Sequence, residues 1–257
     1  MEKRPSQRTK RWYVRCSPCQ HRMSREASYA RSASRRDSQT GLRLASPARS
    51  EANSEKAGET PLTLPVAGTA LLLIDVINDL AFDGSEQLVA QAEAMAAPLA
   101  RLKRRAAAAG VPTIYINDNF GQWRSDFRRT VAHCTGRSSP GRHVSQRLRP
   151  TTRDYFVLKP KHSGFFDTTL DTLLEALNIR RVILTGIAGN ICVLFTANDA
   201  YMRDYKIFAP ADCIVSNTAA DNDYALRQIK TVLKGEVAVS SRLRFHSNRR
   251  RRTARRQ

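Results

Sequence analysis

Cys192 is the residue of this chain best placed for nucleophilic chemistry. It follows an apolar, β-branched run at 181–185 and two glycines, and it begins an apolar periodic segment. This order predicts a buried strand, a tight turn and the first turn of a helix. Unpaired N–H groups at a helix start favour negative charge, so a thiol there is biased towards thiolate. The alternative is a buried structural cysteine, which is common in proteins.

An acid and a cation stand at the ends of two other predicted strands. Asp75 closes the apolar run that begins at Thr69, and Lys159 follows the run at 155–158. In a parallel sheet the carboxyl ends of the strands share one edge, and ligands bind there. A base, a cation and a nucleophile on one edge indicate attack on a carbonyl compound. The alternative for Asp75 is that it caps the following turn.

These three residues depend on a regular alternation of strands and helices. The predicted strands are 69–76, 113–117, 155–158, 181–185, 206–211 and 237–239. The predicted helices are 86–109, 126–133, 168–178, 191–202 and 219–234. Within the longest helix, Pro98 is expected to cause a break or a kink. Strands that alternate with helices of this length predict a parallel sheet covered on both faces.

The positive charge of the chain is concentrated at its two ends. The first 60 residues contain 14 Lys or Arg and 6 Asp or Glu, and residues 242–257 contain 8 Arg and no acid. The segment 61–241 is nearly balanced, so we expect a single folded domain there. Because the ends lack apolar periodicity, we expect a disordered basic extension at 1–60 and a disordered Arg-rich tail at 242–257.

The composition leaves alternatives open for the two ends. The Arg- and Ser-rich beginning is similar to an organelle transit peptide, or to a non-native extension from an early start codon. Flexible arginines neutralise phosphates, so nucleic acid or another polyanion is a candidate partner for the tails, although not for the core. No apolar run reaches the length of a membrane span, so we expect a soluble, cytoplasmic protein without membrane contact.

The cysteines are odd in number and scattered, which argues against a disulfide framework. Cys16 and Cys19, with His21 nearby, are compatible with a zinc site only if two more ligands are well placed. Haem attachment would need a histidine where Gln20 stands. We therefore interpret this pair as incidental.

Three motifs resemble the signatures of the isochorismatase-like cysteine hydrolases. They occur in the family's order, with compatible spacing, as Leu72–Asp75, Lys159-x-x-x-Ser163-x-Phe165 and Thr185-Gly-x-Ala-x-Asn-x-Cys192-Val193. The resemblance extends from about Thr69 to Arg242. It implies a three-layer α/β/α fold with a six-stranded, mostly parallel sheet in the strand order 3-2-1-4-5-6.

The resemblance also implies catalytic roles for the matching residues. Asp75 would be the general base, Lys159 its cationic partner and Cys192 the nucleophile. Lys159 is preferred over Lys161 because it has the family's spacing to Ser163. In the implied strand order, Lys159 and Asp75 belong to strands two positions apart, or ~9.5 Å at the usual strand spacing. The lysine stem must lean across this gap, or the backbone must bend inward.

The oxyanion site is implied by the same resemblance. The peptide bond between Ile187 and Ala188 would be cis, and the N–H groups of Ala188 and Cys192 would point at the oxyanion. One departure is Gly189, where many relatives have threonine. No histidine is placed at a strand end to assist Cys192.

The family's known reactions suggest a substrate class. Members that cleave a vinyl ether can dispense with the cysteine, so its retention favours an amide or carbamoyl compound. Nicotinamidase-type members carry an Asp-x-His-x-x-His metal set after the second strand, and this sequence has no histidine in the corresponding segment at 117–120. We therefore predict no catalytic metal and no cofactor, and we doubt nicotinamide as the substrate.

The substrate itself is not identified by any residue. A partly aromatic pocket for a small molecule is predicted from Phe82, Asn117, Phe120, Trp123 and Phe165. Relatives commonly associate, so a homo-oligomer stays open as an alternative. A catalytically inactive family member is another, because a fold persists without its chemistry.

Overall fold

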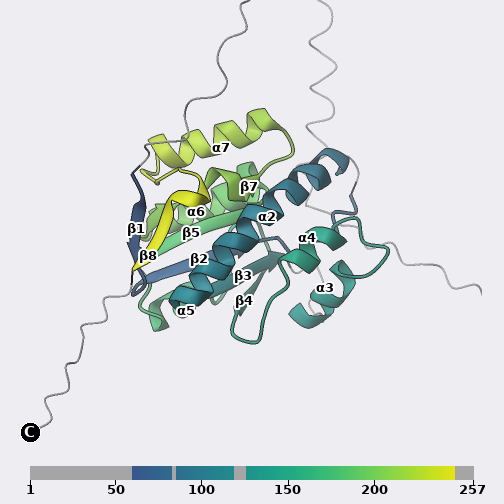
Figure 1. Ribbon diagram of the computed structural model, residues 1–257, viewed down its shortest axis with the longest axis horizontal. Coiled ribbons are helices and arrows are strands. Elements are labelled where there is room, and N and C mark those ends of the chain that lie inside the picture. Colours follow the sequence, from purple (N-terminus) through teal and green to yellow (C-terminus); the bar gives the residue numbers. More distant parts are fainter. Residues whose placement is uncertain (1–59, 83–84, 119–125, 247–257) are drawn as a thin grey trace, which may run out of the picture. The chain divides into compact units, whose positions relative to one another are not determined.

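The computed structural model describes residues 60–82, 85–118 and 126–246 (Figure 1). The strands are β1 (Leu62–Pro65), β2 (Thr69–Ile74), β3 (Thr113–Asp118), β4 (Tyr155–Lys159), β5 (Arg181–Ile187), β6 (Lys206–Phe208), β7 (Ile214–Val215) and β8 (Leu243–His246). The α-helices are α2 (Glu86–Ala109), α3 (Phe127–Cys134), α4 (Arg142–Arg147), α5 (Leu170–Ala176), α6 (Leu194–Tyr201) and α7 (Ala219–Thr231). A π-helical turn, η1 (Gly189–Val193), precedes α6, and short 3-10 turns occur at Ala211–Cys213 and Ser240–Arg242.

The central sheet of the described residues has six strands, which pair in parallel. Five lie in the order β4-β3-β2-β5-β6, and β7 pairs with the carboxyl end of β5. The register sets Ile74 of β2 beside Ile116 of β3 and Gly186 of β5. The three central strands therefore end close to one another, and residues that follow them meet at one rim.

Helices cover both faces of this sheet, as Figure 1 shows. Leu71 and Leu73 of β2 face a core built with α2, α3 and α4. Leu72 and Ile74 face a second core built with α5, α6 and α7. The alternation follows from the strand period of two, with both faces apolar because both are covered. The predicted three-layer α/β fold is thereby confirmed.

The sixth strand differs from the prediction. It is β7, whereas the predicted strand at 237–239 is not regular. Glu236 forms a single bridge with Phe208, and the N–H groups of Ala209 and Ala211 donate to the carbonyl oxygens of Glu236 and Ala238 at 2.9 Å. This segment thus lies beside β6, but it pairs over too short a length to form a strand.

The longest predicted helix is confirmed as α2, which ends at Gly110 in the left-handed conformation. Of the expected break or kink at Pro98, the break is wrong, because α2 continues through Pro98, and the kink stays a prediction. Buried side chains occur on both sides of the proline, from Leu88 to Ala106. Packing of that face onto the sheet outweighs the loss of one helical hydrogen bond.

The folded region extends further than the charge pattern suggested. β1 and β8 form a separate parallel pair, with Leu62 beside Leu243 and Pro65 beside His246. Leu243 is buried against the α2 side of the core. The predicted start of the tail at residue 242 is therefore too early, because the apolar contacts of Leu243 continue the domain to His246.

Residues 1–59 of the predicted basic extension (1–60) and residues 247–257 of the predicted tail (242–257) lie outside the described residues. Cys16 and Cys19 lie there too. Within the described ranges, none of the helices is long and apolar enough to cross a bilayer.

Gly186 gives a test of how tightly the strand ends are packed. Its φ is +115°, and an added Cβ would lie 2.0 Å from the carbonyl oxygen of Ile74. We expect Gly186→Ala to lower the free energy of unfolding by roughly 3 kcal/mol or more, through backbone strain and overpacking. Urea denaturation measures this change.

Gly110→Ala is the matched control for this prediction. Gly110 also has a positive φ, of +88°, but the nearest atom to an added Cβ is 4.0 Å away. The control should cost about 1 kcal/mol, from conformation alone. Equal costs for the two variants would contradict the close approach of β2 and β5.

Candidate active site

Asp75 lies just beyond β2, on the rim formed by the strand ends. It has a φ of +49° and is 5% exposed. The N–H of Asp118 donates to Oδ1 at 2.7 Å, and Nζ of Lys159 lies 2.9 Å from Oδ2. Each carboxylate oxygen therefore has a donor, which a buried anion requires.

Lys159 is the last residue of β4 and is completely buried. In the sheet register it sits beside Asp118, and β3 separates its strand from β2. Its Nζ also lies 3.2 Å from the carbonyl oxygen of Lys161 and 3.4 Å from Sγ of Cys192. The gap of two strands expected from the sequence is thus spanned, and the ammonium stands between a carboxylate and a thiol.

The ammonium stays protonated at neutral pH. Burial alone lowers the pKa of Lys159, but the neighbouring carboxylates, Asp75 first and then Asp118, act against this effect, and the pKa lies above its usual value. A fixed positive charge is therefore present beside the sulfur throughout the neutral pH range.

Cys192 is half-buried within η1, in the turn that follows β5. The peptide bond between Ile187 and Ala188, just before this turn, is cis. The structure thus brings Asp75 and Cys192 to the same ammonium, from elements far apart in the sequence.

The protonation state of the sulfur differs from the prediction. Burial, and then the charge of Asp75, raise the pKa of the Cys192 thiol well above its usual value, and Lys159 only partly opposes this. A helix start is expected to stabilise a thiolate. In this π-helical turn, burial and the charge of Asp75 outweigh that effect and favour the protonated thiol. The resting sulfur therefore carries its proton and needs a base.

Two more side chains reach the site from places that no sequence pattern marked. Nδ1 of His162 lies 4.0 Å from Sγ of Cys192. His162 belongs to the loop after β4 rather than to a strand end. Burial, and then the charge of Lys159, lower its pKa, so the ring is neutral at pH 7. Oδ2 of Asp118 lies 3.8 Å from the same ammonium.

The turn after β5 also arranges backbone N–H groups. Those of Ile191 and Val193 both donate to the carbonyl oxygen of Ala188 at 3.1 Å, and that of Asn190 donates to Ser216 Oγ at 3.1 Å. These groups are engaged inside the protein, and the use of the Ala188 and Cys192 N–H groups as an oxyanion site stays a prediction.

The residues predicted to line a pocket have different environments. Asn117 is 0% exposed, and its Nδ2 donates to the carbonyl oxygen of Ile77 at 2.6 Å, so it does not line an open cleft. Phe82 is half-buried against the α2 side of the core, and Phe165 is buried in the core of the other face. Phe120 and Trp123 lie outside the described residues.

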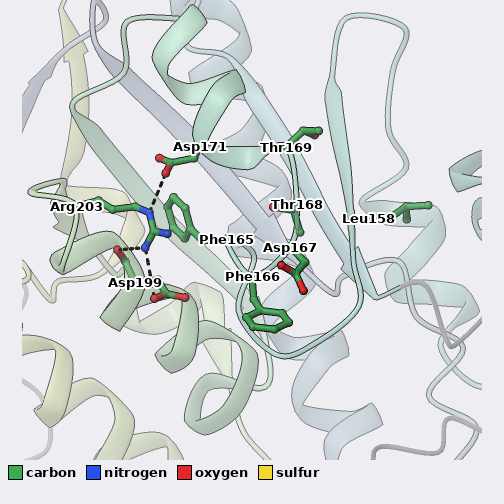
Figure 2. A pocket seen from close by; sticks show the side chains of 9 residues that line it. All are labelled: Leu158, Phe165, Phe166, Asp167, Thr168, Thr169, Asp171, Asp199 and Arg203. Carbon is green, nitrogen blue, oxygen red and sulfur yellow. Dashed lines mark hydrogen bonds and ion pairs between the residues drawn. The ribbon is translucent and has the colours of Figure 1, made fainter.

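A pocket of about 760 Å³ opens between the segment at 165–169, α5 and the end of α6 (Figure 2). Its described lining includes Phe165, Asp199 and Arg203, but not the three candidate catalytic residues. This pocket is therefore distinct from the surroundings of the sulfur.

The described part of the chain contains no group of three or more His, Cys, Asp or Glu side chains that could hold a metal ion. Absence of a metal and of a cofactor from the reaction stays a prediction.

Comparison with known proteins gives one consistent family. A family model described as the isochorismatase domain matches residues 69–241. YaaI, an isochorismatase family protein of Bacillus subtilis, is 45% identical over 177 residues, which are 69% of this chain and 97% of that protein. The ureidoacrylate amidohydrolase RutB of Methylorubrum extorquens is 30% identical over 221 residues, which are 70% of this chain and 86% of that protein.

A solved structure gives the same result. The N-carbamoylsarcosine amidase of Thermoplasma acidophilum has a TM-score of 0.53 and 25% identity, and the match covers 67% of this chain and 96% of that chain. The resemblance seen in the three sequence motifs is thereby confirmed, and the fold is shared across nearly the whole of that relative.

Lys159 allows a test of the buried ion pair. Lys159→Met would leave the carboxylate of Asp75 buried without its cation, and we expect a loss of ~3–5 kcal/mol in unfolding free energy. Adding Asp75→Asn to this variant should recover much of the loss, because no unpaired charge is then left behind. Denaturant unfolding of the single and double variants measures both values.

The exposed ion pair between Arg203 and Asp171 serves as the control. Their side chains are 35% and 53% exposed, so Asp171→Asn should cost less than ~1 kcal/mol. A cost for Lys159→Met as small as that of this control would contradict the burial of the ammonium.

Proposed function

Because this chain belongs to the isochorismatase family, we propose that it is a cysteine hydrolase that cleaves the C–N bond of a small amide or carbamoyl compound. The observation that carries the proposal is the convergence on one buried ammonium, with the Asp75 carboxylate 2.9 Å away and the Cys192 sulfur 3.4 Å away. Cys192 is also partly accessible, as a nucleophile must be.

The first half-reaction forms a thioester. Asp75 takes the proton of the Cys192 thiol as the sulfur attacks the carbonyl carbon, and the positive charge of Lys159 stabilises the sulfur as it loses that proton. The oxyanion accepts hydrogen bonds from the N–H groups of Ala188 and Cys192. The C–N bond then breaks, and Asp75 gives its proton to the leaving amine.

The second half-reaction releases the acid. A water molecule takes the place of the amine, and Asp75 removes a proton from it as it attacks the thioester carbon. The C–S bond breaks, and the sulfur recovers the proton from Asp75. The sum is one amide and one water converted into one carboxylic acid and one amine, and the enzyme returns to its resting protonation state.

The relatives support the carbamoyl class within this proposal. The names of two of them, a ureidoacrylate amidohydrolase and an N-carbamoylsarcosine amidase, describe hydrolysis of compounds that carry a carbamoyl-nitrogen group. Retention of Cys192 supports the same choice, since vinyl ether cleavage does not need a sulfur nucleophile.

The covalent mechanism predicts a large effect at Cys192. We expect Cys192→Ala to lower kcat for hydrolysis of N-carbamoyl amino acids and simple primary amides by roughly 10³-fold or more. Asp75→Asn should cause a comparable loss, because both half-reactions lose their base. Steady-state assays of ammonia release measure these rates.

Cys134→Ala is the control, because Cys134 is also a free cysteine but is buried in the core beside α2. Its kcat should stay within about twofold of wild type. Full turnover by the Cys192→Ala variant would exclude a covalent mechanism. A wild-type protein that hydrolyses none of these compounds, and whose Cys192 is not acylated by an activated ester, would favour an inactive family member.

The basic tails suggest polyanion binding as a second candidate function, separate from hydrolysis. Residues 242–257 are rich in arginine, and such segments bind polyanions. Removing residues 1–60 and 247–257 should abolish polyanion binding and leave hydrolysis intact if the folded domain is the enzyme.

A further inference from the structure

One side of the helix that carries the nucleophile faces the loop that follows Lys159. Cys192, Thr196 and Asp199 are spaced by four and three residues, so they lie along one stripe of the continuous helix formed by η1 and α6. This stripe meets the loop at 160–165.

Two hydrogen bonds join Thr196 and Asp199 of the stripe to the loop. The N–H of Gly164 donates to Oγ1 of Thr196 at 3.0 Å, and the hydroxyl of Ser163 donates a short hydrogen bond to Oδ2 of Asp199. Ser163 is 5% exposed, so its hydroxyl lies on the buried side of this contact, whereas the Asp199 side chain is 37% exposed. The loop is therefore fixed to the helix two turns beyond the sulfur.

The Asp199 carboxylate is itself held from its other side. Oδ1 lies 3.4 Å from Nη1 of Arg203, whose Nε lies 3.0 Å from Asp171 of α5. The guanidinium carbon of Arg203 stands 4.7 Å from the ring centroid of Phe165. Figure 2 shows Arg203 between the two carboxylates and beside this ring. One oxygen of Asp199 thus remains directed at Ser163.

The loop in turn sets the position of the catalytic cation. The carbonyl oxygen of Lys161 accepts a hydrogen bond from Nζ of Lys159 at 3.2 Å. The direction of the ammonium therefore depends on where the loop backbone lies. A shift of this carbonyl would change the distance from the ammonium to the sulfur.

From these contacts we propose that Asp199 is a positioning residue for the proposed hydrolysis, on which this inference rests. Through Ser163 it holds the loop at 160–165, whose carbonyl oxygen at Lys161 orients the buried ammonium. Among the described contacts, Asp199 meets neither the ammonium nor the sulfur, so it acts through the loop.

The kinetic test uses the full chain with Asp199→Ala, Ser163→Ala and the double variant. The probe is 4-nitrophenyl acetate, and release of 4-nitrophenolate reports acylation of Cys192. We expect each single variant to lower the acylation rate constant roughly 10- to 100-fold with KM nearly unchanged. The double variant should be no slower than the slower single variant, because both remove the same hydrogen bond.

A conservative variant and a matched control separate positioning from stability. Asp199→Asn keeps an oxygen that accepts from Ser163, so it should retain most of the acylation rate. Asp154→Asn breaks a shielded ion pair with Lys103, of 2.7 Å, just before β4 begins. The control should lower the unfolding temperature and leave the acylation rate constant at 25 °C unchanged.

A wild-type acylation rate constant in either alanine variant would overturn the proposal. So would a double variant whose fold-loss in the acylation rate constant is the product of the two single fold-losses. Crystal structures of both alanine variants test the positioning without any turnover. We expect the contact between the Lys161 carbonyl oxygen and Lys159 Nζ to be lost. Its retention in both structures would overturn the proposal, even if the wild-type protein hydrolyses no amide.

Discussion

The candidate site depends on the buried ion pair between Lys159 and Asp75. Two charges this deeply buried are tolerated only if neighbouring groups satisfy their remaining hydrogen bonds. The N–H of Asp118 and the carbonyl oxygen of Lys161 do so, from β3 and from the loop after β4. The pair therefore ties together three adjacent strands of the sheet. The proposed chemistry therefore requires this strand order. If a strand other than β4 lay beside β3, the ammonium of Lys159 would not reach the rim.

The same pair determines how the sulfur is used. Burial and the Asp75 carboxylate keep the proton on Cys192, and the ammonium opposes them only in part. In the proposed reaction the thiolate therefore forms beside a bound carbonyl group, and the resting protein holds a less reactive thiol. The neutral ring of His162 lies 4.0 Å from the sulfur and adds no charge at neutral pH. The reactivity of Cys192 thus depends on whether its proton stays on the sulfur or has moved to Asp75.

The positions of the strand ends could be predicted from the sequence. The contacts made by the segments between those strands could not. Buried parallel strands are continuous apolar runs, so the runs before Asp75 and Cys192 were recognisable and their shared edge followed. His162 reaches the sulfur only because its loop is fixed against α6, and no local pattern contains that contact. β1 and β8 have four residues each, which is too short to show a hydrophobic period. They pair with each other from the two ends of the domain's sequence. The pKa of the thiol likewise depends on burial and on distances between separate elements.

The central claim is that Cys192 carries the acyl group during turnover, and mass spectrometry of peptides from acid-quenched protein tests it most directly. We expect the peptide that contains Cys192 to gain the mass of the acyl half of the substrate, and hydroxylamine to remove it, as for a thioester. An unmodified Cys192 peptide in every sample quenched during rapid acylation by an activated ester, or an acyl group on another residue instead, would contradict the claim.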